Sequence, residues 1–404
     1  MISNKKYVRG SSPKASVVVR PGWKWIFLGP IDGNNTQPSP NQTQSAPNAT
    51  QTHRPGSIYT PRPQSSESST SRFQPQSILQ QQSPSYRVES RFDFQSINLA
   101  LNQEWIELDL YALRRFSPSE FREAGLNVSD RVLVNFMADQ EVSHATVLSN
   151  ILGPAKPCQY EYPFNTVRGF IDFAQKLTRW GESGVYGFLS FLENPNSAQL
   201  LLESIATEAR QQQIYRQFEG LFPVTVYHVV GIPQSWAWTL LHPYLKSCPK
   251  SNPFVEFDIY PSLRILNNPN PYAINPQPPS IAPIRNTSLS QPGRRVFFRF
   301  DRPGRRVNPD GDYQTVSRSR SRFPRYAAWA SQYNVTYSEL RNVNSTSAWT
   351  IQPNSTLFPN QVNYPSINGT MFIVLTDTNL PVTPSNITLL NDHIIAGPAV
   401  YQVD

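Results

Sequence analysis

The sequence predicts an α+β protein of several domains: a disordered N-terminal tail, a four-helix bundle and a β-rich, sandwich-like C-terminal module. Three changes of character along the 404 residues indicate this order. Residues 34–85 are mainly Pro, Gln, Ser, Thr and Asn, residues 92–245 contain long apolar-periodic runs, and after Pro249 short alternating segments are separated by Pro and Asn. The predicted domains are therefore 1–90 (tail), 91–250 (bundle) and 251–404 (module).

The composition narrows the class of protein. The chain has 38 proline residues against 18 glycine residues, and only 16% of its residues are charged, so part of it is not packed helix or strand. No run approaches the roughly 20 apolar residues that a membrane-spanning helix needs, so we expect a soluble or peripheral protein. Collagen-like and disulfide-dense proteins are excluded. Cys158 and Cys248 form one disulfide or remain two buried thiols, and the sequence does not decide between them.

The tail cannot bury enough apolar surface to offset its ordering entropy, so it is expected to be disordered. The chain also carries many Asn-x-Ser/Thr glycosylation acceptors, which favours an extracellular or cell-surface glycoprotein, although an Asn- and Ser-rich chain also forms such triplets by chance. No clear signal peptide is present, because the best early apolar run, Trp25 to Ile31, is short and contains Gly29 and Pro30. The acceptors are Asn34, Asn41, Asn48, Asn127, Asn286, Asn334, Asn344, Asn354, Asn368 and Asn386.

The predicted bundle has four main helices with capping residues at their ends. They are expected at Ser96 to Phe116, Ser129 to Gly153, Thr166 to Leu192 and Asn196 to Gly220, and Pro233 opens a shorter fifth helix that reaches Leu241. The break after the first helix is placed at Ser117-Pro118.

Each main helix has a carboxylate in its inward, otherwise apolar stripe. In the second helix Glu141 and His144 complete the stripe of Leu133, Met137, Leu148 and Ile151. Glu104, Glu182 and Glu208 occupy the matching positions of the other helices, with Gln211 following Glu208 at the i+3 position. Glu107, Glu193 and Glu203 lie off these stripes and are expected to be solvated, whereas Tyr111, Tyr186 and Tyr215 are expected to be core aromatics.

Buried carboxylates need compensating cations, and two divalent ions neutralise four of them. Carboxylate and imidazole ligands suit iron or manganese. The predicted metal ligands are Glu104, Glu141, His144, Glu182, Glu208 and Gln211. The alternative is that the Glu-x-x-His pair arises by chance on a solvated face and that Glu182 or Glu208 lies at a bundle edge. Four matches on successive helices favour the shared site.

These residues resemble the ferritin-like superfamily, whose di-iron bundles carry Glu, Glu-x-x-His, Glu and Glu-x-x-His on successive helices. The runs EWIELDLY, FMADQEVSHATVLSNILGP, FAQKLTRWGESGVYGFL and TEARQQQIYRQFEGLFP are most similar to the fungal stress-response, glucose-repressed proteins with a ferritin-like domain. The C-terminal run GTMFIVLTDTNLPVTPSNITLLNDHIIAGPAVYQ is also similar to these proteins, so the resemblance covers residues 92–404. Plant desiccation-related proteins are more distantly similar.

The resemblance implies ligand roles by position. Glu104 takes the first helix's role, Glu141 and His144 form the first Glu-x-x-His, Glu182 is the third helix's glutamate, and Glu208 begins the second Glu-x-x-His. Gln211 stands where the family pattern has histidine. An amide is a weaker ligand than imidazole, so the resemblance implies either two ions or a single ion with a weakened second position.

Positive charge is concentrated between Arg294 and Arg325. This stretch contains ten arginines and only three acidic residues, Asp301, Asp310 and Asp312. The alternatives are a nucleic-acid site, a site for an anionic cell-wall or surface polymer, and a solvated loop between strands, and the loop is favoured because no nucleic-acid-binding fold surrounds the stretch. The oligomeric state is not predicted.

Two functions follow from these patterns. The first is a di-metal carboxylate protein that handles iron, oxygen or peroxide in stress protection. The second is a metal-free secreted or surface protein that uses the bundle as a scaffold. No nucleophile elbow, Walker loop or HExxH motif is present, and no residue is assigned a catalytic role. Whether the protein is an enzyme is left open.

Overall fold

The structure is a computed structural model that describes residues 86–112, 116–153, 155–271, 288–354 and 369–403, together with the backbone of β1 (Val18–Arg20) and β2 (Trp23–Trp25). Phe73–Asp404 form one compact unit, distinct from Met1–Arg72. Within Met1–Arg72, β1 and β2 pair antiparallel. The predicted disorder of the tail and the acceptors Asn34, Asn41, Asn48, Asn286 and Asn368 lie outside the described residues.

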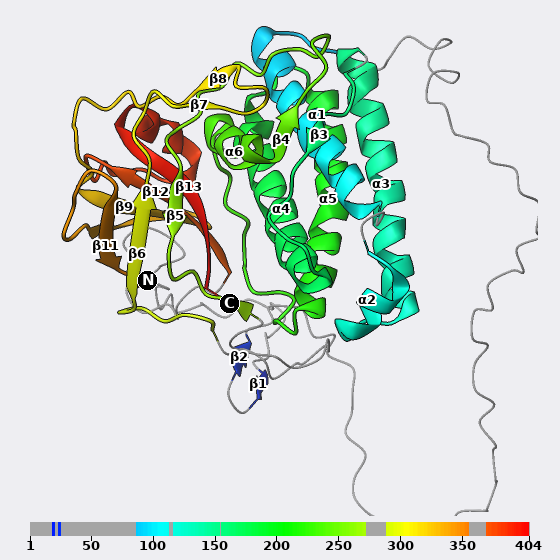
Figure 1. Cartoon of the computed structure of the whole chain (residues 1–404), viewed down its shortest axis with the longest axis horizontal. Helices are drawn as coiled ribbons and strands as arrows, with labels where there is room; N and C mark the ends of the chain where they lie inside the picture. Colours follow the sequence, from blue (N-terminus) through cyan, green and yellow to red (C-terminus); the bar gives the residue numbers. More distant parts are fainter. Residues whose placement is uncertain are drawn as a thin grey trace, which may run out of the picture. The chain divides into compact units, whose positions relative to one another are not determined.

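Four long helices form the predicted bundle: α1 (Arg91–Tyr111), α3 (Val128–Leu152), α4 (Val167–Phe188) and α5 (Pro195–Phe218) (Figure 1). The pairs α1 with α3 and α4 with α5 make the most extensive contacts. The caps set the helix starts: the Asn127 side chain accepts hydrogen bonds from the backbone N–H groups of Ser129 and Asp130, and the Asn194 side chain does the same for α5.

The largest differences from the predicted helix boundaries lie in α1, which also ends at Tyr111 rather than at Phe116, at the Ser117-Pro118 break and at the end of α4. Helix α1 begins at Arg91, five residues before the predicted start, because Ser90 caps it. The Ser117-Pro118 break opens a short helix, α2 (Pro118–Glu123), with Ser117 as the N-cap. Helix α4 ends at Phe188 and continues as a 3-10 turn, Leu189–Phe191. The fifth helix is α6 (Gln234–Leu241).

The apolar stripes are largely as predicted, with one clear error. Leu133 is 38% exposed, because the inward face of α3 passes through Val134, which is fully buried, and Leu133 lies at the edge of that face. Tyr111 and Tyr215 are fully buried, and Tyr186 is half-buried.

The C-terminal module contains two larger antiparallel sheets. One has the order β10 (Asn334–Glu339), β9 (Tyr326–Ser331), β12 (Thr370–Thr376) and β13 (Ile394–Gln402); the other has the order β11 (Ser347–Ile351), β6 (Arg295–Phe300) and β5 (Leu263–Ile265). Two small ribbons pair β3 (Gln159–Tyr160) with β4 (Leu245–Ser247) and β7 (Arg306–Val307) with β8 (Tyr313–Gln314).

The four-stranded sheet is buried on both faces. On one face Trp329 and Ile373 pack with Val296 of the three-stranded sheet. On the other face Phe372 and Val374 belong to the same core as the bundle helices. This explains why β12 is apolar along its whole length rather than alternating, as expected for a strand covered on two sides.

Glycine lets α6 and the segment before it approach α4 closely. A Cβ on Gly187 would lie 1.8 Å from the backbone oxygen of Ile232, and a Cβ on Gly184 would lie 2.9 Å from the Cβ of Ala237. The backbone N–H of Ile232 donates to the oxygen of Ser183 at 2.9 Å, so the contact is made by the main chain itself. A larger side chain at Gly187 would separate the two segments.

Cys158 and Cys248 form a disulfide, which resolves the alternative that the sequence left open. The bond lies beside the β3–β4 ribbon and closes a loop with a sequence separation of 90 that contains α4, α5 and α6. In the part of the chain that the structure describes, no helix combines the length and the apolar character needed to cross a bilayer.

Candidate metal centre

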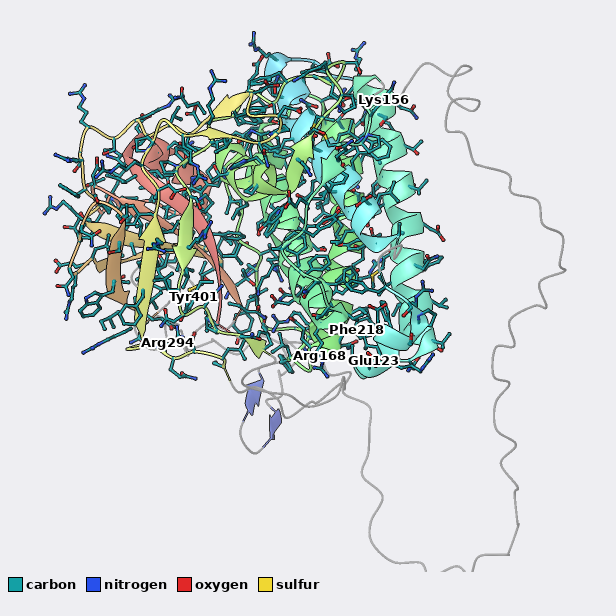
Figure 2. All side chains as sticks on the ribbon, in the orientation of Figure 1. Glu123, Lys156, Arg168, Phe218, Arg294 and Tyr401 are labelled. Atoms are coloured by element: carbon teal, nitrogen blue, oxygen red, sulfur yellow. A yellow bond between two sulfur atoms is a disulfide. The ribbon has the colours of Figure 1, made fainter. Side chains whose placement is uncertain are left out.

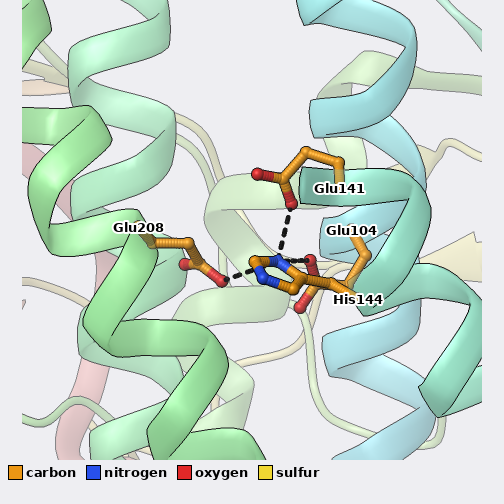
Figure 3. Close-up of side chains that lie close together, drawn as sticks. All are labelled: Glu104, Glu141, His144 and Glu208. Carbon is orange, nitrogen blue, oxygen red and sulfur yellow. Dashed lines mark hydrogen bonds and ion pairs between the residues drawn. The ribbon is translucent and has the colours of Figure 1, made fainter. Parts of the chain in front are cut away.

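Four side chains from three helices meet inside the bundle: Glu104 of α1, Glu141 and His144 of α3, and Glu208 of α5 (Figure 3). One ligand atom from each lies within 4.8 Å of the others. Each of the three carboxylates is at most 2% exposed. An enclosed space surrounded by three glutamates and one imidazole is typical of a site for a divalent cation.

The helix geometry sets this arrangement. Glu141 and His144 are three residues apart and therefore lie on the same face of α3. His144 Nδ1 lies 3.0 Å from Glu141 Oε2, 3.3 Å from Glu104 Oε2 and 4.0 Å from Glu208 Oε1. The same ring nitrogen therefore faces all three carboxylates.

The other ring nitrogen of His144 has its own partner. Nε2 lies 3.1 Å from Thr207 Oγ1, and this hydroxyl donates its single hydrogen to the backbone oxygen of Ser204. Thr207 must therefore accept from Nε2–H, which leaves the Nδ1 lone pair of a neutral His144 directed at the carboxylates. Fixing the tautomer through a second hydrogen bond is a regular property of histidine ligands to metals.

The carboxylates are held in an unfavourable environment. Burial raises the pKa of Glu104 to about 7, although the hydrogen bond and charge of His144 lower it in part. Burial and the charges of neighbouring carboxylates raise the pKa of Glu208 well above its usual value. Burial alone would lower the pKa of His144, but hydrogen bonds to Glu104 and Glu141 and their charges raise it. The site therefore favours protons or other cations over free carboxylate charge.

The donor set fits a metal ion. Glu208 Oε2 and Gln211 Oε1 are buried and have no hydrogen-bond partner among the described residues. Buried oxygen atoms of this kind normally have a partner, so these two are available to a cation. Together with His144 Nδ1, they form the oxygen and nitrogen donor set that iron and manganese accept.

Comparison with known proteins agrees with this geometry. Residues 92–221 match the family described as ferritin-like domain. Over 336 residues the chain is 46% identical to protein rds1 of Schizosaccharomyces pombe, and this match covers 79% of the chain and 83% of rds1. The chain belongs to this family of fungal ferritin-like proteins. The match to rds1 is longer than the ferritin-like domain, so the similarity between the two fungal proteins extends beyond the bundle.

Four of the six predicted ligands of the ferritin-like bundle form the cluster, and the other two, Glu182 and Gln211, lie beside it. Glu182 pairs with Arg179, whose Nη1 lies 2.9 Å from Glu182 Oε2. Gln211 Nε2 donates to Glu141 Oε1 at 2.5 Å and to Gln140 Oε1 at 3.2 Å. Arg179 thus supplies the positive charge that a second ion would supply next to Glu182.

The expectation that Glu107 is solvated was wrong. Glu107 is fully buried, and burial together with the charges of Glu141 and Glu104 raises its pKa. Its position three residues after Glu104 places it on the same helix face, so the spacing was a usable signal. The ion pair between Arg179 and Glu182 could have been predicted in the same way, because Arg179 precedes Glu182 by three residues on one helix face. Glu193 and Glu203 are exposed, as predicted.

A hollow of about 210 Å³ opens at His144 between α3 and α5 and is lined by Ser143, Val147, Leu201 and Ser204 among others. Of the four cluster residues, His144 alone lines this hollow. A larger hollow of about 780 Å³ lies between α4 and the C-terminal module. We associate the chemistry with the smaller one, because the larger contains none of the six predicted ligands.

Proposed function

We propose that this fungal ferritin-like protein binds divalent iron or manganese through Glu104, Glu141, His144 and Glu208 and uses it in handling oxygen or peroxide during stress. The observation that supports this proposal is the convergence of four ligand atoms within 4.8 Å in a buried site. Iron bound there would supply electrons to dioxygen or peroxide. The chain's own contribution is to orient the ligands, to limit access to the opening at His144 and to exclude bulk water.

The number of bound ions is limited by the charge of the buried side chains. Glu104, Glu107, Glu141, Glu182 and Glu208 carry five negative charges when ionised, and Arg179 carries one positive charge. Two divalent ions would balance this set with a neutral His144, whereas one ion would leave protons on the remaining carboxylates. We propose one tight site at the cluster and a second, weaker one that draws on Glu182 and Gln211.

Replacing Glu208 by glutamine tests the site. The substitution removes one of the converging carboxylates at constant shape, so we expect the metal-free protein to become about 1–3 kcal/mol more stable. Metal binding at the cluster should weaken sharply. Metal content of the full chain purified from iron- and manganese-supplemented cells, together with urea unfolding after chelation, measures both effects.

Glu123→Gln is the matched control, because Glu123 is exposed, lies on α2 and lines neither the cluster nor the hollow at His144. It should change neither metal content nor stability. The rival function, a metal-free scaffold, predicts no metal above background in the wild type and the same unfolding curve with and without chelator. That result would exclude the metal proposal.

We further propose that the protein acts outside the cytosol, in an oxidising compartment. Two observations support this: the Cys158–Cys248 disulfide and the exposure of the acceptors Asn127, Asn344 and Asn386. Treating the protein from fungal culture medium or cell wall with an N-glycosidase should lower its apparent mass. Unglycosylated protein found only inside the cell would contradict this localisation.

A further inference from the structure

The outer surface of the three-stranded sheet is strongly basic. Strand β6 alternates, with Val296, Phe298 and Phe300 buried in the module core and the residues between them exposed. Neighbouring strands and the turn before β11 add further side chains to this surface. The cationic face consists of Arg264, Arg295, Phe297, Arg299, Arg341 and Trp349.

In the part of the chain that the structure describes, no carboxylate neutralises the arginines of this face. Arg264 and Arg299 are directly opposite each other in the β5–β6 register, and like charges in such a pair destabilise a sheet. None of the four arginines has an ion pair among the described residues. Asp301, the residue directly after β6, is paired with Arg305 at 2.8 Å.

The two undescribed segments that adjoin these strands in the sequence contain no acidic residue. Residues 272–287, between β5 and β6, and residues 355–368, after β11, contain no Asp or Glu. An anion bound across Arg264 and Arg299 would relieve the repulsion between these two side chains.

Aromatic residues hold part of the face in place. The guanidinium groups of Arg295 and Arg341 each lie 5.2 Å from the ring centroid of Trp349. Such stacking orders the side chains while leaving their N–H edges free to bind phosphate, sulfate or carboxylate. Arg294 is different: it lies beside Tyr401 and donates to its hydroxyl and to the backbone oxygen of Asn267, so it is a structural residue (Figure 2).

We propose that the cationic face binds an anionic polysaccharide. Arg295 and Arg299 are four residues apart on one strand, which corresponds to about 13 Å and is too far for one small anion to bridge. A chain with repeating anionic groups can contact both ends. Phe297, which is 41% exposed, adds an apolar surface for sugar rings. Nucleic acid is less suitable, because the two guanidinium groups on Trp349 cover the ring on which a base would stack.

The test compares two variants of the full chain with equal charge. Arg264→Gln/Arg299→Gln removes two charges from the face, and Arg122→Gln/Arg210→Gln removes two exposed arginines from the bundle. Binding to polygalacturonate and to uncharged dextran is measured by titration at two salt concentrations. We expect salt-sensitive binding to polygalacturonate alone, with roughly tenfold or greater weakening in the face variant and less than twofold change in the bundle variant.

Thermal unfolding gives a second readout. The face variant should be as stable as the wild type or slightly more stable, because the substitution removes the repulsion between Arg264 and Arg299. Equal weakening in both variants would show that only net charge matters and would overturn the proposal. Tighter binding of a single-stranded oligonucleotide or of phosphatidylserine vesicles, lost in the face variant, would assign the face to another partner and would also overturn it.

Discussion

Arg179→Gln is expected to lower the free energy of unfolding of the metal-free protein by about 3–5 kcal/mol. Arg179 and Glu182 are both buried and lie 2.9 Å apart, and the substitution leaves Glu182 without its counter-charge. Burial already raises the pKa of Glu182, so the unpaired carboxylate would take up a proton or expose itself to water. Urea unfolding after chelation measures the loss.

Adding iron or manganese should restore part of this stability, because a second ion can then replace the guanidinium beside Glu182. The variant should therefore gain more stability from metal than the wild type does. Arg91→Gln is the control: its ion pair with Glu256 is largely exposed, so removing it should cost less than about 1 kcal/mol. If Arg179→Gln proved as stable as Arg91→Gln, the Arg179 pair would not be what neutralises Glu182.

Removing the disulfide with Cys158→Ala/Cys248→Ala is expected to cost roughly 2–5 kcal/mol. The bond closes a loop with a sequence separation of 90, which restricts the unfolded chain and ties the α4–α6 part of the bundle to the residues that follow α3. Urea unfolding of the variant and of the oxidised wild type gives the difference.

The wild type in reducing buffer is the matched control, since it keeps both cysteine side chains and loses only the cross-link. It should unfold like the variant. A variant as stable as the oxidised wild type would mean that contacts in the folded state, such as the β3–β4 ribbon, hold this region without the bond.

Local sequence patterns were sufficient to predict the bundle and all four members of the cluster. Apolar periodicity and caps such as Asn127 are local signals, and a carboxylate inside an apolar stripe is visible at single positions such as Glu104, Glu141 and Glu208. The C-terminal sheets were predicted as a class only, because the pairing of distant strands such as β5 with β6 has no local signal.

The partner of each buried charge depends on how distant helices pack together, and local spacing alone does not decide it. Glu107 and Glu182 are both buried, yet one joins the carboxylates and the other pairs with Arg179, because the rotation of α1 and α4 about their axes depends on how the neighbouring helices pack. The arginines of the basic stretch also have different surroundings. Arg294 donates a hydrogen bond to the Tyr401 hydroxyl, whereas Arg299 lies opposite Arg264 on an exposed sheet surface. Side-chain environment is a property of packing between distant segments, which single-sequence patterns do not contain.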